Sequence, residues 1–467
     1  MIEEQDRAEA PDERDGRRSV LMFAYYFPPC VCWPTASMRA EGLATNLPQE
    51  GWDPIVVTRG NGCPCLESGS SAVIADMSFQ PDVDVRRVSV HPSLIERIWI
   101  ATGRWRKAGR VGRVAYRLLK PVRKARGLTE HRNDWQRRAL AEGRALVRER
   151  DVHALWTTSG PYLTIGVGRS LQRRHRIPWV ADLRDSITRE RAWADLIGKV
   201  AGHHLRRRWY RHLKKASAVV GVSPQEAEID GRALDLEVHP LPSGFDLTTW
   251  ESLRAAGEPR SNRDERFRIL YAGAFYGDRV ELGGLVFRGL RRFVDHETGQ
   301  PPVSFTYIGP HGRYFSSEAA KHGCEDIAED GSVVAPTDAR RMMMQADLLL
   351  LLIPKTQEGG MPGGKLYEYL AAGPPILAVH DTDPYVMGVI RETRAGDGAS
   401  TLEDIAEVIA RRYEDWRMGR AVPRLLEGLT SFTWSSRAQQ LAALLDSLAS
   451  PGSGRIDVVD PTEGILT

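Results

Sequence analysis

The sequence predicts an α/β protein of two Rossmann-like domains, in which two parallel sheets covered by helices face each other across a cleft. Two observations lead to this fold class. Both halves of the 467-residue chain alternate short, almost continuously apolar runs with helical segments, and such runs are typical of strands that are covered on both faces. The composition, 42% hydrophobic and 27% charged, is that of a globular protein long enough for two or three domains.

The first domain is expected over residues 19–245, after a charged, flexible tail at 1–18. A helix that starts at Thr35 and stops at Gly51 should join its first two strands. Residues 190–215 have a long, charged helical pattern, and a basic insertion is expected at about 95–150. The strands are predicted at residues 19–27, 54–59, 154–159, 178–184 and 218–223.

The second domain is expected over residues 246–430. The polar stretch 251–266 lacks apolar periodicity, and we interpret it as a linker. An amphipathic helix over 431–449, capped by Thr433 or Ser435, should end the fold, with the option that it crosses back to the first domain. Residues 450–467 are expected to form a second flexible tail. The strands are predicted at residues 268–275, 304–310, 333–336, 347–353 and 375–379.

The sequence favours a cytoplasmic protein. No apolar run approaches the roughly 20 residues that a membrane-spanning helix needs, and the N-terminus lacks the apolar centre of a secretory signal. Five cysteines in such a chain fit a reducing compartment. Four of them form two C-x-C pairs, Cys30 with Cys32 and Cys63 with Cys65. A zinc site and a disulfide are possible alternatives for these pairs, but free thiols are favoured. Neither a metal nor a cofactor is therefore expected.

Positive charge is concentrated in one part of the chain. The net charge is only +3, yet residues 101–150 contain 16 Lys/Arg against four Asp/Glu. Aromatic residues such as Trp99, Trp105 and Tyr116 accompany that charge. Contact with an anionic membrane surface and a merely structural insertion are both open. Nucleic-acid binding is the least favoured alternative, and no nucleic-acid partner is expected.

The stretch "GGMPGGKLYEYLAAG", residues 359–373, follows an apolar strand and comes closest to a functional motif. Gly359, Gly364 and Lys365 have the spacing of an ATP-binding P-loop. A P-loop, however, needs Ser or Thr after the lysine to hold magnesium, and this chain has Leu366 there. The motif therefore argues against a nucleoside triphosphatase.

The same stretch suits a metal-free phosphate site at the start of a helix. The amides of Gly363 and Gly364 and the helix dipole can face a diphosphate. Lys365 adds a full positive charge at the same place. Glu368 lies one helical turn further on and faces the same side, where its carboxylate can accept hydrogen bonds from ribose hydroxyls. We expect this helix start to bind a nucleotide diphosphate.

Several segments resemble one known enzyme family. The segment "PGGKLYEYLAAGPPILAV" resembles the nucleotide-sugar motif of family-4 glycosyltransferases, in the polysaccharide-biosynthesis-like branch. "YYFPP", "GWDPIVVT", "TTSGPY", "PWVADLRD" and "GFD" resemble the acceptor domain of that family, and "YAGAFYGDR" resembles the start of its donor domain. The resemblance covers about residues 19–448. It implies the GT-B fold and a transfer that usually retains the configuration of the sugar.

The resemblance also implies where the nucleotide sugar binds. Val334 lies in the segment that adjoins the nucleobase, and Glu368 holds the ribose. Many members carry an additional glutamate before the ribose-binding one, with seven residues between the two, and this chain has Gly360 in that position. The expected donor-binding residues are Gly273, Phe275, Val334, Gly363, Gly364, Leu366 and Glu368.

Sugar transfer requires that the leaving diphosphate be neutralised, which preorganised cations achieve. Arg279 and Lys365 are the expected cations, with Lys355 as an alternative companion. Asp185 is the candidate base or orienting carboxylate for the acceptor hydroxyl, although the departing phosphate can itself take the proton. Arg39, Ser159, Asp182 and Arg184 are expected on the acceptor side, with internal ion pairs as the alternative for the charged ones.

The favoured hypothesis is a cytoplasmic, metal-independent glycosyltransferase that moves a sugar from a nucleotide diphosphate sugar to an acceptor hydroxyl. The acceptor is expected among the intermediates of surface polysaccharide or glycolipid assembly, with a lipid-linked acceptor and a peripheral membrane location left open. Two alternatives remain. One is a transferase that acts on a soluble secondary metabolite. The other is an inactive GT-B scaffold that binds a nucleotide sugar or a partner.

Overall fold

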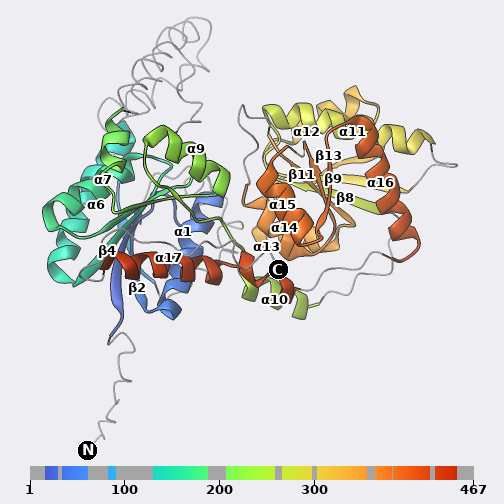
Figure 1. Ribbon diagram of the computed structural model, residues 1–467. Helices are drawn as coiled ribbons and strands as arrows, with labels where there is room; N and C mark the ends of the chain where they lie inside the picture. Colours follow the sequence, from blue (N-terminus) through green and yellow to red (C-terminus); the bar gives the residue numbers. More distant parts are fainter. Residues whose placement is uncertain are drawn as a thin grey trace, which may run out of the picture.

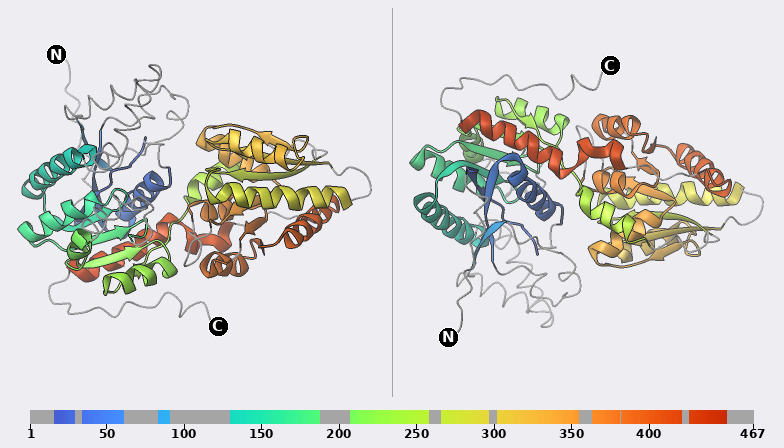
Figure 2. Two further views of the ribbon diagram at one scale, coloured as in Figure 1. Left: turned by 90° about the horizontal axis from the view of Figure 1, so that it is seen from above. Right: turned by 90° about the horizontal axis from the view of Figure 1, so that it is seen from below.

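The computed structural model describes residues 16–29, 34–60, 83–90, 130–187, 207–257, 266–296, 302–354, 363–380, 382–420 and 426–449. Within them the chain folds into two α/β domains that lie side by side (Figure 1). The three views agree that the C-terminal helix α17 (Trp434–Ala449) runs back along the first domain from the junction between the two (Figures 1 and 2).

The first domain is built on a seven-stranded sheet in the order β3-β2-β1-β4-β5-β6-β7, with every neighbouring pair parallel. The order reverses between β1 and β4, which makes the carboxyl ends of these two strands a topological switch point. The strands are β1 (Arg18–Phe23), β2 (Trp52–Arg59), β3 (Asp84–Val88), β4 (Val152–Thr158), β5 (Trp179–Leu183), β6 (Ala218–Gly221) and β7 (His239–Pro240).

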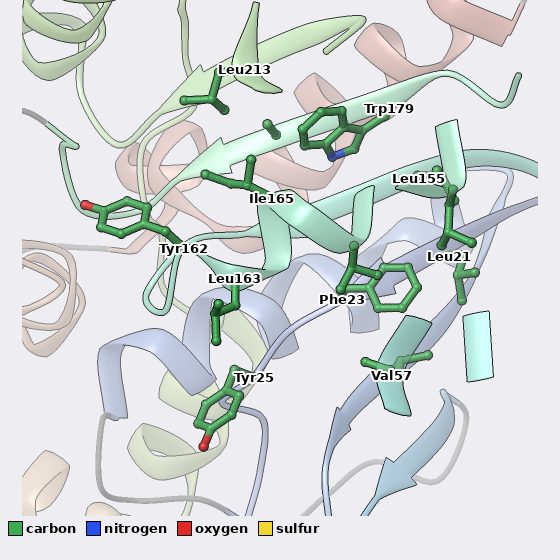
Figure 3. Close-up of a cluster of buried hydrophobic side chains, with 14 of the residues drawn as sticks. Leu21, Phe23, Tyr25, Val57, Leu155, Tyr162, Leu163, Ile165, Trp179 and Leu213 are labelled. Atoms are coloured by element: carbon green, nitrogen blue, oxygen red, sulfur yellow. The ribbon is translucent and has the colours of Figure 1, made fainter. Parts of the chain in front are cut away.

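Both faces of this sheet are buried because its central strands carry mostly apolar side chains on both sides. In β1, Leu21 and Phe23 point to one face, and Val20 and Met22 point to the other. The first face is covered by α6 (Glu130–Glu149), α7 (Leu163–His175) and α9 (Pro224–Leu234); the second is covered by α1 (Pro34–Asn46) and α17. Figure 3 shows the first face, where Leu163 and Ile165 of α7 lie over side chains of the strands.

The second domain has a six-stranded parallel sheet in the order β10-β9-β8-β11-β12-β13, with its switch point between β8 and β11. The five leucines of β11 alternate between the two faces and contribute to two separate cores. The strands are β8 (Phe267–Ala272), β9 (Val303–Ile308), β10 (Ala328–Asp330), β11 (Leu348–Leu352), β12 (Ile376–Val379) and β13 (Gly396–Ala399).

Helices cover both faces of the second sheet as well. One face packs against α11 (Asp278–His296), α12 (Gly312–Lys321) and α16 (Leu402–Arg417). The other packs against α10 (Leu247–Ala255), α13 (Pro336–Gln345), α14 (Lys365–Ala372) and α15 (Pro384–Glu392). The second group includes α13 and α14, which pack against each other and carry the charged residues of the candidate site.

The chain crosses between the domains twice, and the two crossings are hydrogen-bonded to each other. Phe245 forms a parallel bridge with Thr433: its amide donates to the Phe432 carbonyl at 3.1 Å, and its carbonyl accepts from the Trp434 amide at 2.9 Å. The Thr433 hydroxyl accepts from the Ser436 amide at 3.2 Å and so caps α17, as the sequence predicts. The Trp434 ring then packs on Gly42 of α1, where a β-carbon would lie 2.3 Å from it.

The predicted fold class, two facing Rossmann-like parallel-sheet domains, is confirmed. Two element predictions are wrong. The apolar run at 333–336 is not a strand. Only Val333 in it is exposed, and the run leads into α13 because Pro336 suits the first turn of a helix; the edge strand is β10 instead. The stretch 251–266 is not simply a linker: through Ala255 it belongs to α10, which Asp246 caps and buried Trp250 anchors in the second domain.

Part of the predicted basic insertion belongs to the core. Residues 130–149 form α6, whose Trp135, Ala139 and Leu146 are buried in the first domain. Residues 91–129, which carry most of the excess charge, lie outside the described residues, as do all four cysteines of the C-x-C pairs. The fifth, Cys324, is buried and free. Within the described ranges, no helix combines the length and apolarity needed to cross a bilayer.

Candidate functional site

The start of α14 lies beside the switch point of the second sheet, since α14 follows β11 along the chain. Leu366 to Ala372 are all buried, which fixes the helix in the core, and Gly373 with φ 102° ends it. The Leu366 amide donates to the Gly363 carbonyl at 3.1 Å and the Glu368 amide to the Gly364 carbonyl at 3.2 Å. The amides that precede Leu366 therefore lie at the open end of the helix, where an anion is favoured.

Lys365 and Glu368 share one side of this helix start. Lys365 is half-buried, and burial lowers the pKa of its ammonium group; the nearby Glu368 carboxylate opposes that effect and the Arg340 guanidinium adds to it. Glu368 is only 6% exposed. A carboxylate this deeply placed requires polar partners, and its two cationic neighbours provide them.

Arg340 of α13 is the neighbour that the sequence did not single out. Its Nε lies 3.5 Å from Oε2 of Glu368, and its side chain is mostly buried. Arg341, the next residue, is exposed and pairs with Asp338 of the same helix at 3.1 Å. Two consecutive arginines in the sequence could have indicated a cation near the site. Only the packing of α13 on α14, however, decides which of the two faces Glu368.

The segment from the end of β8 to the first turn of α11 contributes one half-buried cation and one core residue. Phe275 is fully buried and packs edge-on against Tyr307 and Phe315. Its ring therefore holds the loop on the core and is not available to a bound donor. Gly273 has φ 153°, and its amide donates to the Ile308 carbonyl at 2.9 Å. Arg279, in the first turn of α11, is half-buried and makes no ion pair within the described ranges.

The Arg279 guanidinium acts on a residue of β8, next to the switch point. Burial raises the pKa of Tyr271, and the positive charge of Arg279 opposes that rise. Two other predicted donor residues contribute main-chain groups at most: Leu366 is fully buried, and Val334, between β10 and α13, packs partly on the core. Lys355, Glu358 and Gly360 lie outside the described residues.

In the first domain, Asp185 and Arg184 form an ion pair just beyond the carboxyl end of β5. The Arg184 side chain lies over Gly160, where a β-carbon would be 2.1 Å from Nη2, and its Nε donates to the Ser159 carbonyl at 3.3 Å. Asp185 keeps 46% of its side chain exposed. Ser159 is buried, and its hydroxyl has no hydrogen-bond partner in the part of the chain that the structure describes. These residues therefore come together at the carboxyl ends of β4 and β5, next to the switch point.

Arg39 and Asp182, also expected on the acceptor side, are placed elsewhere. They pair with each other in the interior, and neither side chain is exposed. Arg39 donates to both carboxylate oxygens of Asp182 at 2.9 and 2.7 Å and to the carbonyls of Leu241 and Pro242 at 2.9 and 3.3 Å. The pair therefore fixes the crossing segment between the domains, as the internal ion-pair alternative has it, and offers no surface to an acceptor.

The start of α14 faces the junction with the first domain. Burial raises the pKa of Tyr367 in α14, and the guanidinium groups of Arg437 in α17 and of Arg39 oppose that rise; Arg437 also donates to the Ser243 carbonyl at 3.3 Å. Burial likewise raises the pKa of Glu41 in α1, and the Arg340 guanidinium opposes that rise. The site thus combines a helix start, two cations and a buried carboxylate in the second domain, next to the first domain.

Comparison with known proteins identifies the architecture. No family model matches the chain, and the curated proteins contain no match either. Among solved structures, sucrose-phosphate synthase from Thermosynechococcus elongatus matches with a TM-score of 0.61 at 15% identity, over 92% of this chain and 99% of that one. A glycosyltransferase from Rickettsia africae has a TM-score of 0.57 at 10% identity, over 93% and 100%.

Anabaena HepE in complex with UDP and glucose matches with a TM-score of 0.55 at 14% identity, over 92% of this chain and all of that one. Identities this low establish a shared fold and nothing finer. The chain has the GT-B fold, which confirms that part of the family resemblance.

Proposed function

We propose that the chain is a glycosyltransferase of the family-4 type that transfers a sugar from a nucleotide diphosphate sugar to an acceptor hydroxyl. One observation carries the proposal: Lys365 and the buried Glu368 sit together at the open N-terminus of α14, beside a switch point and at the junction of two GT-B domains. The HepE structures, which contain UDP and UDP-glucose, support a nucleotide-sugar donor.

The donor is held by charge and by hydrogen bonds. The Lys365 ammonium and the first amides of α14 face the diphosphate, with Arg279 of the first turn of α11 as the second cation. Glu368 accepts hydrogen bonds from the ribose hydroxyls. In the reaction, the bond between the sugar C1 and the diphosphate oxygen breaks, and the fixed cations stabilise the negative charge that develops on that oxygen.

The acceptor approaches from the first domain. Its hydroxyl oxygen forms the new bond to C1, and its proton passes to the departing phosphate oxygen in a retaining transfer. Asp185, held by Arg184 and half-exposed, orients that hydroxyl or takes the proton instead. With Lys365 and Arg279 neutralising the diphosphate, the reaction proceeds without a metal ion. We further propose a lipid-linked acceptor of surface polysaccharide or glycolipid assembly, used at the cytoplasmic face of the membrane.

Calorimetric titration with UDP-glucose, GDP-mannose and dTDP-glucose tests the donor site. For the sugar nucleotide that binds, Glu368→Gln should weaken binding by about tenfold to a hundredfold, since a hydrogen bond to a charged group contributes about 1.5–3 kcal/mol. Glu318→Gln is the matched control, because Glu318 is also a buried carboxylate with basic side chains beside it, Lys321 at 3.0 Å and His322 at 3.1 Å, but lies on the other face of the sheet. Equal losses in both variants would contradict the assignment.

An inactive scaffold is the second candidate, favoured by Gly360 in the position where many family members have a glutamate. Both candidates bind a nucleotide sugar, so binding does not separate them. Slow hydrolysis of the bound donor does. Release of free sugar by the wild type, reduced in Lys365→Met, supports the transferase, whereas tight binding with no turnover in either protein supports the scaffold.

A further inference from the structure

The hydroxyl group of Tyr369 joins two elements of the second domain that carry donor-site cations. It accepts a hydrogen bond from the Ala272 amide at 2.9 Å and donates to the Ala272 carbonyl at 3.4 Å. Tyr369 belongs to α14, which begins at Lys365, and Ala272 is the last residue of β8. The two residues are 97 positions apart in the sequence, so only folding brings them together.

The switch point of the sheet explains why a side chain binds this amide. In the pairing of β8 with β11, the last registered pair is Leu270 with Leu349. The Gly273 amide donates to a carbonyl of β9 at 2.9 Å, and since successive amides of a strand alternate in direction, the Ala272 amide turns towards β11. Pairing with β11 has already ended at this level, and the Tyr369 hydroxyl takes the place of a β11 carbonyl.

The contact lies in the dry core of the second domain. Tyr369 is 0% exposed and Ala272 is 2% exposed. A buried amide without a hydrogen-bond partner is costly, because it has lost its water and gained nothing in return. Removal of the hydroxyl should therefore make the end of β8 shift until the Ala272 amide finds another acceptor.

The end of β8 leads directly to Arg279, which follows in the first turn of α11. The segment between them is fixed by its own hydrogen bonds. The Tyr271 hydroxyl donates to the Ala274 carbonyl at 2.9 Å, and the Arg279 amide donates to the Tyr276 carbonyl at 3.3 Å. Because the segment is short and held in this way, a shift of Ala272 is passed on to Arg279.

We propose that Tyr369 is a positioning residue that sets the distance between the two cations of the donor site, Lys365 and Arg279. Lys365 lies four residues before Tyr369 on the same side of α14, and Arg279 follows the strand end that Tyr369 binds. The inference rests on the proposed function and adds to it the group that aligns the diphosphate contacts. Tyr369 acts through Arg279 and does not touch the donor, because its side chain is wholly buried.

Calorimetric titration of Tyr369→Phe with UDP-glucose, GDP-mannose and dTDP-glucose tests this role, since phenylalanine keeps the ring and removes only the hydroxyl. For the sugar nucleotide that binds the wild type, the variant should bind about tenfold more weakly, because a cation is displaced from a charged ligand.

Tyr367→Phe is the matched control. Tyr367 belongs to the same helix and is also buried, but its hydroxyl pairs with that of Tyr385 at 2.9 Å and not with β8. The control should bind the donor within about twofold of the wild type, because its hydroxyl has no contact with the segment that carries Arg279. Thermal unfolding should show a similar loss of stability in Tyr367→Phe and Tyr369→Phe, since each removes one buried hydroxyl.

A double-mutant cycle separates positioning from a general loosening of the domain. If Tyr369 acts through Arg279, Tyr369→Phe should weaken donor binding by less than about twofold in an Arg279→Gln background, against about tenfold in the wild type. A general loosening would weaken binding by the same factor in both backgrounds.

Two results would overturn the positioning role and leave the donor site standing: equal weakening by Tyr369→Phe and Tyr367→Phe, or additive effects of Tyr369→Phe and Arg279→Gln. If Tyr369→Phe does not fold, Tyr271→Phe carries the test, because it releases the Ala274 carbonyl in the same segment. It should show the same coupling to Arg279, and additive effects would again overturn the role. Wild-type protein that binds none of the three sugar nucleotides would overturn the proposed function itself.

Discussion

Replacing Arg39 by methionine should destabilise the first domain far more than the loss of an ordinary ion pair would. Both members of the Arg39–Asp182 pair are inaccessible to solvent. Removal of the guanidinium leaves the Asp182 carboxylate buried without its counter-charge and two carbonyls of the crossing segment, those of Leu241 and Pro242, without a donor. A buried pair broken in this way costs about 3–5 kcal/mol.

The double variant Arg39→Met/Asp182→Asn identifies the cause. If the cost arises mainly from an uncompensated charge, a neutral amide in place of the carboxylate should recover part of it, so that the double variant is more stable than Arg39→Met alone. Loss of packing alone would give no such recovery. The surface pair of Arg138 and Asp134, at 3.0 Å with the Arg138 side chain 45% exposed, is the control, and Arg138→Met should cost about 0–1 kcal/mol.

The assay is urea unfolding monitored by circular dichroism, together with tryptophan fluorescence to separate the transitions of the two domains. Arg39→Met should shift the transition of the first domain and leave the second nearly in place. A loss below about 1 kcal/mol, comparable with that of Arg138→Met, would refute the view that this pair is the electrostatic anchor of the crossing segment.

Two further predictions concern local geometry. Gly160→Ala should cost about 1–3 kcal/mol in the same unfolding assay, because Gly160 has φ 87° and a β-carbon there would lie 2.1 Å from the Arg184 guanidinium. The control is Gly388→Ala, inside α15 with open space around it, which should be neutral or stabilising. A larger loss of stability in Gly388→Ala than in Gly160→Ala would contradict the strain argument. Burial raises the pKa of the Cys324 thiol to about 11, so peptide mapping after iodoacetamide treatment at about pH 8 should find Cys324 unmodified in the folded protein and modified in concentrated guanidinium. Rapid modification of the folded protein would show that the thiol is accessible.

The sequence predicted an element correctly where the local pattern of apolar residues indicates that the element is buried. Five consecutive leucines at 348–352 indicate a strand covered on both faces, and they form β11 between two cores. Short edge elements carry no such pattern: β3 with its two arginines, the two-residue β7 and the glycine-containing β13 were not predicted, because main-chain pairing with a neighbouring strand holds them in place.

For the candidate site, the sequence determined that a short buried helix begins at Lys365 with its lysine and Glu368 on one side, because residues three positions apart on a helix are neighbours whatever surrounds them. Tertiary structure alone decided the other partners. Arg39 meets Asp182, 143 residues away, and Arg340, not Arg341, turns to Glu368. Such contacts depend on how separate elements pack, and the pattern within any one element holds no information about where another element will lie.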